Sequence, residues 1–413
     1  MRAKLKSPLF ILFVTIFLDL LGFGILIPVI PSLFANPNST SYLLANGASI
    51  ETGYLLMGLL IGLFFIGQFF MSPVLGELSD RFGRKKVLFV SVAGSALSYL
   101  LFGIGIMTKS ILIVFFARAV NAVTSSILSV SQATIADITS PAQRTKNFGI
   151  IGAAFGMGFV VGPFLGGTLS NPAIVSWFGP TIPFWFASLL ACINAISVLL
   201  FLPETNKHLV HRPLTFTRSI RNIHRAFHMR ELRSLFATNF FFQAGFTFFT
   251  TFFSVFLITR YGFSQQGIGN YFAYTGIWIA ISQGFLLRLI PQTVESKNIL
   301  RISILCTSIF ILLQFFTETW WELLFIVPFL AIANGFSAAN IQGAISRRAT
   351  PSAQGEIMGL NASVESLARA IPPLISGFVA AVLSPSSPLI ISSLLIFIAW
   401  VIFVMTRPTK KAA

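Results

Sequence analysis

The stretch Gly76–Lys86, GELSDRFGRKK, places two acids and four bases within eleven residues, between two long apolar segments. Apolar segments of that length predict membrane spans, so we expect the charged stretch to form a tight loop at the membrane surface. Asp80 can pair with Arg81 or Arg84, or accept hydrogen bonds from a helix N-terminus. The bases predict a cytoplasmic loop. A merely solvated loop is the alternative interpretation.

The composition is that of a membrane protein. Of the 413 residues, 55% are hydrophobic and 10% are charged, whereas soluble proteins carry about 25% charged residues. The net charge of +16 would suit nucleic-acid binding, but the bases concentrate in the two tails and in alternate loops, as orientation signals do. Only Lys109 and Arg260 fall in loops expected outside. We therefore predict an all-α membrane protein with no nucleic-acid partner.

Apolar runs predict about twelve transmembrane helices, each near the roughly 20 residues that cross a bilayer. We expect two pseudo-symmetric bundles of six helices, residues 1–203 and 234–413, joined by a cytoplasmic basic linker at residues 204–233. The expected spans are 8–31, 53–73, 87–107, 110–136, 147–170, 181–203, 234–259, 267–290, 299–317, 321–345, 355–383 and 387–406.

The even number of spans places both ends of the chain on one side of the membrane. Basic residues occur at both ends, so the positive-inside rule predicts that both termini are cytoplasmic. These bases are Arg2, Lys4, Lys6, Arg407, Lys410 and Lys411.

The linker contains all the histidines of the chain, which permit a pH sensor or a metal site. The alternative is a solvated segment that is attracted to lipid head groups by its arginines. Ile220, Ile223 and Phe227 have helical spacing, so part of the linker is expected to lie on the membrane surface as a helix. The histidines are His208, His211, His224 and His228.

The two halves of the chain repeat one another at a constant offset. Matches that span a loop and the following helix indicate duplicated halves, an arrangement that transporters use. Ser140-Pro141 corresponds to Thr350-Pro351, Gln132 to Gln342, Gly149 to Gly359, Pro163 to Pro373 and Gly167 to Gly377.

Two ionisable residues fall inside spans of the first half, Asp19 in the first and Arg118 in the fourth. A charge within a bilayer is costly and faces a partner or a water-filled cavity. Asp19 is the natural partner of Arg118, and the pair is either structural or involved in gating and proton movement. Asn121 and Gln132, further along the fourth span, contact substrate or bridge helices.

The fifth span contains an ordered run of small residues with one proline. Small residues at such intervals let a neighbouring helix approach closely, and the proline permits a bend. The run consists of Gly149, Gly158, Gly162, Pro163, Gly166 and Gly167.

In the second half, Glu365 and Arg369 lie four residues apart and so share a helix face. They either neutralise each other, or Glu365 is a proton-carrying acid. Amide and aromatic side chains in these spans suit a mostly apolar cavity for an amphipathic organic ligand. Besides the two amides of the fourth span, the candidates are Asn239, Gln243, Tyr274, Trp278, Asn334, Gln342 and Asn361.

These motifs resemble those of a known family. The stretch Gly76–Lys86 is similar to the signature loop between helices 2 and 3 of the major facilitator superfamily, and the fifth-span run resembles the motif of its drug–proton antiporters. Together with Asp19–Pro31, Ala136–Thr139 and Pro203–Thr205, they resemble the tetracycline-efflux branch. The resemblance is dense in the first half and thin in the second.

The resemblance implies roles for individual residues. Asp19 and Arg118 would be functional intramembrane charges, and the run Gly149–Gly167 would mark an antiporter helix. Asn121-Ala122 departs from the family, whose fourth-span motif often has Gln-Gly. A gating loop that latches the two halves would consist of Gly76, Asp80, Arg81, Gly83 and Arg84.

We therefore predict a secondary active transporter, a proton-coupled antiporter that exports an amphipathic drug or metabolite by alternating access. We expect a monomer in the cytoplasmic membrane of a bacterium, with lipid, protons and a small organic substrate as partners. The alternatives within transport are a siderophore or metabolite exporter and an uptake symporter. A membrane sensor without transport is the remote alternative.

Other function classes lack support in the sequence. The spans contain no histidine cluster and no nucleophile–base pattern that would indicate an enzyme. The sequence also contains no phosphate-binding loop that would indicate ATP hydrolysis. Cys192 and Cys306 lie in apolar runs and indicate neither a disulfide nor a metal site. We expect no cofactor and no metal.

Overall fold

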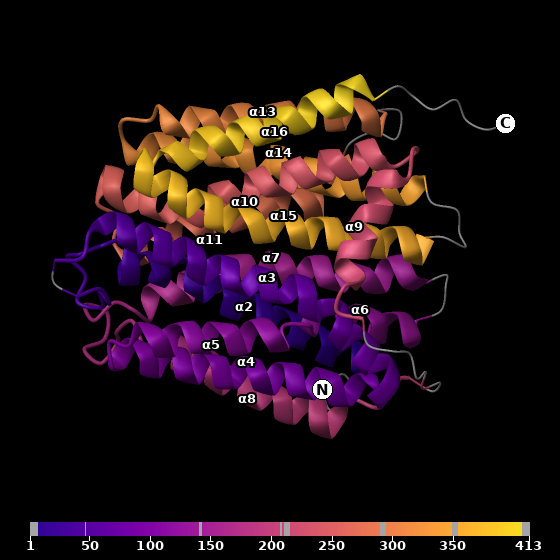
Figure 1. The fold of residues 1–413 in the computed structure, drawn as a ribbon, viewed down its shortest axis with the longest axis horizontal. Helices are drawn as coiled ribbons and strands as arrows, with labels where there is room; N and C mark the ends of the chain where they lie inside the picture. The colour runs from indigo at the N-terminus through magenta and orange to yellow at the C-terminus, as the bar shows by residue number, and fades with distance from the viewer. Residues whose placement is uncertain are drawn as a thin grey trace. The chain divides into compact units, whose positions relative to one another are not determined.

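The computed structural model describes residues 7–45, 47–139, 143–206, 209, 215–289, 295–348 and 354–406. Within these residues the chain forms helices and turns and no strand (Figure 1). Eleven helical segments of the described chain are long and apolar enough to cross a membrane, with Ile111–Asp137 counted as one. The predicted all-α membrane fold is confirmed.

The helices of the first half follow the predicted spans, except that α3 continues beyond residue 73 to Phe82. Their bounds are α2 (Pro8–Phe34), α3 (Ile50–Phe82), α4 (Arg84–Met107), α5 (Ile111–Thr124), α6 (Ile127–Asp137), α7 (Arg144–Thr168) and α8 (Ile182–Phe201). α5 and α6 together form the fourth span and are separated by Ser125 and Ser126. The Ser125 hydroxyl accepts a hydrogen bond from Gln68 Nε2 at 3.1 Å, and that of Ser126 bonds the Ser91 hydroxyl at 2.8 Å. Serine also has a lower helix propensity than alanine or leucine, so a pair of serines is compatible with a break between two helices.

The linker contains a short helix, as predicted, and the helices of the second half follow it. The bounds are α9 (Arg218–His228), α10 (Arg233–Tyr261), α11 (Gln265–Ile281), η2 (Ser282–Leu286), α12 (Leu287–Leu289), α13 (Ser296–Phe315), α14 (Trp320–Arg347), α15 (Gln354–Val382) and α16 (Ser387–Met405). α11, the π-helical turn η2 and α12 follow one another without a break and fill the predicted span 267–290. The π turn leaves α11 with 17 residues, so this interrupted run is not counted among the eleven segments that are long enough to cross a membrane.

Local sequence explains several helix ends. The side chains of Ser49 and Ser110 accept backbone N–H bonds at 3.3 and 3.4 Å and so cap α3 and α5. Proline occupies the first turn of α2, α8 and α16, where its missing N–H is not needed. α10 ends at Gly262, whose φ of 68° is left-handed and favours glycine.

Large apolar side chains cover much of the exterior of the helices. Leu112 is 80% exposed and Leu200 65%, and similar side chains are exposed on most of the long helices. A soluble monomer rarely exposes apolar surface on this scale, whereas lipid is a suitable solvent for it.

Packing divides the chain into two compact units. One consists of Met1–Gly53, Ile66–Phe216 and Phe263–Gly276, and the other of Tyr54–Phe65, Thr217–Gly262 and Ile277–Ala413. In the first unit α2 packs against α7, and α4 against α5 and α8 (Figure 1). In the second, α10 packs against α15 and α16, and α13 against α14 and α16. The bundle boundaries at residues 203 and 234 stay a prediction.

Candidate functional site

The charged stretch Gly76–Lys86 is helical except at one residue. Gly76–Phe82 belongs to α3, and Arg84 begins α4, so the predicted tight loop is wrong. Gly83 alone makes the turn, with a φ of 98° that glycine adopts without strain. α3 continues past Pro73 and Gly76 and ends at Phe82. A Cβ at Gly76 would meet no described atom within 4 Å, so that glycine makes no close approach to a described residue.

Arg84 binds two carboxylates of the same unit. Its Nη1 lies 2.7 Å from Oδ1 of Asp80, and its Nε lies 3.1 Å from Oδ2 of Asp137. Nη1 also donates to Ser79 Oγ at 2.6 Å. The Arg84 side chain is only 12% exposed, so these charge-assisted bonds are screened less than a surface ion pair. Asp80 thus pairs with Arg84, one of its predicted partners, and the ends of α3, α4 and α6 are joined.

The N-terminus of α4 is bound by Glu204 rather than by Asp80. The Glu204 carboxylate accepts from the backbone N–H of Arg84 at 2.9 Å and of Lys85 at 3.2 Å. It also accepts from the N–H groups of the two residues that follow it, both at 3.0 Å. A negative charge at this position suits the helix dipole. This role of Glu204 could not be predicted, because a contact across 120 residues leaves no local signal in the sequence.

Two further contacts fix the start of the linker within this unit. Asn206 Nδ2 donates to the backbone oxygen of Asp80 at 3.0 Å, and the Thr205 hydroxyl donates to Asp137 Oδ2 at 3.3 Å. The segment after α8 is therefore bound to both α3 and α6.

Asp19 and Arg118 do not form the predicted ion pair, since their charged atoms are not within 4.0 Å of each other. Tyr99 of α4 instead interacts electrostatically with both. The Tyr99 phenol lies against Gly22 of α2, at a place where any Cβ would overlap it. Arg118 is 2% exposed. Three helices, α2, α4 and α5, thus contribute ionisable groups to one buried region.

The small residues of α7 face two different helices. A Cβ at Gly158, Gly162 or Gly166 would lie 2.6 to 2.7 Å from atoms of α2, which therefore runs backbone to backbone along α7. Gly167 faces α11 instead. Gly149 meets no described atom within 4 Å. Pro163 lies inside α7, which continues past it.

In both units two helices cross in close contact at a pair of glycines, one on each helix. In the first, a Cβ on Gly269 of α11 would lie 3.1 Å from the Cα of Gly167 on α7. In the second, a Cβ on Gly58 of α3 would lie 3.0 Å from the Cα of Gly377 on α15. Gly167 and Gly377 are matched residues of the sequence repeat, so the repeat is present in the packing as well.

Four polar candidates of the second half converge, and we call them the amide–carboxylate cluster: Asn239, Gln342, Asn361 and Glu365. Oε1 of Glu365 accepts from Asn239 Nδ2 at 3.1 Å, from Asn361 Nδ2 at 3.0 Å and also from Gln342 Nε2. Asn361 in turn accepts from Asn239 at 2.7 Å and donates to Gln342 at 3.1 Å. The two asparagines are each 2% exposed. The cluster joins α10, α14 and α15.

Arg369 does not pair with Glu365, although it lies one helical turn away. No ion pair within 4.0 Å joins the two side chains, so of the two alternatives the one in which they neutralise each other as an ion pair is wrong. The amide donors of α10, α14 and α15 compensate the carboxylate instead. Arg369 itself is half-buried.

Other polar candidates have separate environments. Asn121 donates to a serine of α4 at 3.4 Å. Gln132 is exposed and Gln243 half-buried, and neither side chain has a hydrogen bond with a described residue. Asn334 is 8% exposed, and its Oδ1 has no hydrogen-bond partner among the described residues. Tyr274 and Trp278 are half-buried on α11.

Two of the linker histidines lie within the described residues. The rings of His224 and His228 stack with centroids 4.0 Å apart. In the described part of the chain no group of three or more His, Cys, Asp or Glu side chains could hold a metal ion. His208, His211, Ser140-Pro141, Thr350-Pro351 and the bases of both tails lie outside the described residues.

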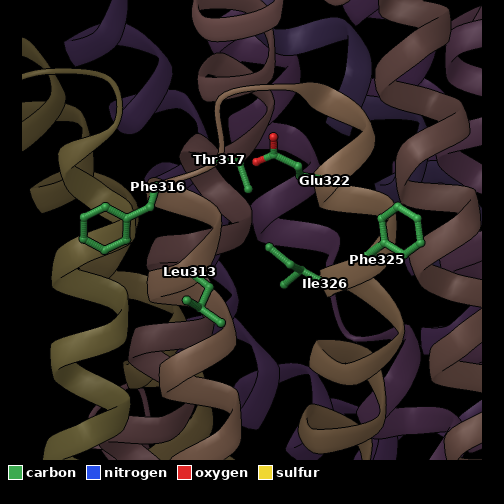
Figure 2. Close-up of a pocket in the computed structure, with 6 residues that line it drawn as sticks. All are labelled: Leu313, Phe316, Thr317, Glu322, Phe325 and Ile326. Atoms are coloured by element: carbon green, nitrogen blue, oxygen red, sulfur yellow. The ribbon is translucent and has the colours of Figure 1, made fainter.

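A pocket of about 290 Å³ lies at the turn between α13 and α14. Figure 2 shows Phe316 and Phe325 on opposite sides of it and the Glu322 carboxylate near the turn. Glu322 is already bound by the Thr319 hydroxyl at 2.5 Å and the Glu318 N–H at 3.1 Å. None of the predicted site residues lines this pocket, whose walls are Leu313, Phe316, Thr317, Glu322, Phe325 and Ile326.

The chain matches the model of a known protein family over most of its length. Residues 12–298 and 292–413 match the family model of the Major Facilitator Superfamily. The chain belongs to this superfamily. It is 29% identical to the class H tetracycline resistance protein of Pasteurella multocida, over 91% of the chain and 89% of that protein. It is 27% identical to multidrug resistance protein 2 of Bacillus subtilis (strain 168), over 90% and 88%. The predicted resemblance to the tetracycline-efflux branch is confirmed.

Solved structures of the superfamily share the fold. The human organic anion transporter aligns with a TM-score of 0.72 and 23% identity, covering 96% of this chain and 98% of that one. A D-xylose-proton symporter aligns with a TM-score of 0.77 and 14% identity, covering 98% of each chain. The protein is therefore a multi-pass membrane protein of a family of secondary transporters.

Proposed function

We propose that this facilitator is a proton-coupled antiporter that exports an amphipathic drug or metabolite through the cytoplasmic membrane of a bacterium. The family supports transport of a small molecule. Relatives named for resistance to tetracycline and to multiple drugs support export. The chain works as a monomer, with both termini in the cytoplasm.

The amide–carboxylate cluster is the observation that supports proton coupling. An ionised carboxylate within a span needs compensation, and Glu365 receives it from amide donors on α10, α14 and α15. Hydrogen bonds to an ionised acceptor are about twice as strong as neutral ones. Protonation of Glu365 therefore weakens the bonds that join three helices, and loss of the proton restores them.

Asp19 is the second candidate for proton coupling. It lies half-buried on α2, and its carboxylate interacts with Tyr99. A change in its charge alters the environment of the buried Arg118. Proton flux measured in variants of Glu365 and of Asp19 identifies which of the two acids binds the transported proton.

The proposed cycle links these charges to alternating access. Protonation of Glu365 or Asp19 shifts the balance between inward-facing and outward-facing arrangements of the bundles 1–203 and 234–413. The latch that favours one arrangement consists of Gly76, Asp80, Arg81, Gly83 and Arg84.

The test uses purified protein in liposomes that contain a pH-sensitive dye. A panel of amphipathic compounds, including tetracyclines and metal-chelating metabolites, is added under an imposed proton gradient. We expect at least one compound to trigger proton flux opposite to its own movement. Glu365→Gln is expected to abolish that flux while leaving compound binding measurable. Glu318→Gln, which changes an exposed acid whose side chain has no hydrogen bond with a described residue, is the matched control.

Each outcome selects one mechanism. Compound and protons that move in the same direction would replace antiport by symport. If Glu365→Gln kept full coupling and Asp19→Asn lost it, Asp19 and not Glu365 would be the residue that binds the transported proton. Movement of compounds without any proton flux would overturn the coupling, and silence across the whole panel would favour a sensor.

A further inference from the structure

The linker helix α9 has three faces, of which the first faces the protein. Successive residues of an α-helix are about 100° apart, which places Ser219, Asn222 and Ala226 together. Ser219 is 1% exposed and Ala226 0%, and Asn222 Nδ2 donates to the hydroxyl of Ser363 on α15 at 3.0 Å. α9 therefore docks through small side chains beside the N-terminal part of α15 (Figure 1).

The second face of α9 is apolar. Ile220, Ile223 and Phe227 lie on it, as their spacing predicts. Ile220 is 52% exposed, and Phe216, just before the helix, is 58% exposed. Ile223 and Phe227 are half-buried. Exposed apolar side chains beside a spanning helix suit the acyl region of a bilayer.

The third face of α9 is basic. Its exposed side chains are Arg218, Arg221, His224, Arg225 and His228. Arg225 pairs with Glu356 of α15 at 2.6 Å, yet its side chain remains 64% exposed. The helix contains no acid of its own, so its surface carries an excess of positive charge.

We infer that α9 binds anionic phospholipid, with its apolar face among the acyl chains and its basic face against the phosphates. Charge complementarity selects this partner, because a neutral bilayer satisfies the apolar face and offers no negative charge to the excess positive charge of the basic face. Ser363 lies two residues from both Asn361 and Glu365, so bound lipid acts on the helix that holds the amide–carboxylate cluster. This inference is independent of the transported substrate.

The test uses the full chain with one reactive cysteine. Cys192→Ser and Cys306→Ser remove the native thiols, and Ile220→Cys introduces a site for an environment-sensitive fluorophore. The protein is reconstituted in phosphatidylcholine vesicles with or without phosphatidylglycerol, and each lipid is supplied in turn in brominated, quenching form. Leu112→Cys, at an exposed apolar position on α5, is the control probe.

We expect brominated phosphatidylglycerol to quench the Ile220→Cys probe more than brominated phosphatidylcholine does, and salt to reduce the difference. Arg221→Gln should lower the preference for phosphatidylglycerol about fivefold, whereas Arg301→Gln on α13 should leave it unchanged. The Leu112→Cys probe should show no preference. Equal quenching of the Ile220→Cys probe by both lipids, or a preference that survives Arg221→Gln, would overturn the inference.

Discussion

Replacing Glu204 by alanine is expected to destabilise the start of α4. The carboxylate accepts backbone N–H bonds from Arg84, Lys85 and the two residues after it. Loss of a side-chain cap costs about 1 kcal/mol, and loss of an anion at a helix N-terminus costs about 0.3 to 1 kcal/mol. Glu204 is exposed, so water replaces some of the lost bonds. We expect a total decrease of about 1.5 kcal/mol in the free energy of unfolding.

Two further variants separate the contributions. Glu204→Gln keeps an acceptor and removes only the charge, so about 0.3 to 1 kcal/mol should be lost. Gly83→Ala places a Cβ 2.7 Å from the Glu204 carboxyl carbon, at a φ of 98° that strains any L-residue. It should cost about 1 to 3 kcal/mol and displace the cap as well.

The assay is equilibrium unfolding in mixed micelles of dodecyl maltoside and dodecyl sulfate, followed by circular dichroism. Glu318→Gln is the control, since its side chain has no hydrogen bond with a described residue. The expected order of stability is wild type, Glu204→Gln, Glu204→Ala. If Glu204→Ala unfolds at the wild-type midpoint, the cap does not stabilise α4 and the reasoning fails.

Two further predictions concern packing and the polar cluster. Gly269→Val should cost about 1 to 3 kcal/mol by overpacking the crossing with α7; Gly152→Val, where no described atom lies within 4 Å, should be nearly neutral, and equal thermal unfolding of the two variants would contradict the crossing. Asn361→Ala should destabilise by about 2 to 3 kcal/mol, because it removes hydrogen bonds to three side chains and leaves buried groups unsatisfied. Its effect should be smaller when Glu365→Gln is also present, and strictly additive effects in a double-mutant cycle would show that the two do not interact.

The spans could be predicted because hydropathy is a local property of the chain. The helical state of Gly76–Phe82 could not, because charge marks a segment as polar without fixing its backbone. The predictions treated the whole stretch as loop, although Gly83 alone needs a conformation that ends a helix.

The residues of the candidate site could be predicted from the sequence, but the hydrogen bonds between them could not. Asn239, Gln342, Asn361 and Glu365 were each selected as polar residues within spans, yet their convergence on one carboxylate oxygen depends on how α10, α14 and α15 pack. The same limit explains the two wrong ion pairs. Spacing along a helix and shared burial suggested partners, whereas Tyr99 and the amides supply the interactions that the packing brings within reach.

The π-helical turn η2 has a consequence for chain length. Ser282, within it, packs against Gly335 of α14 and donates to the backbone oxygen of Ile332 at 3.2 Å. A π turn holds one residue more than an α turn, so deleting one residue of Ser282–Leu286 would restore α geometry and leave both flanks facing as they do now. The same deletion within the uninterrupted α10 would rotate every later side chain by about 100°. At η2 the membrane span can therefore lose a single residue during evolution without turning the helix on either side of the deletion.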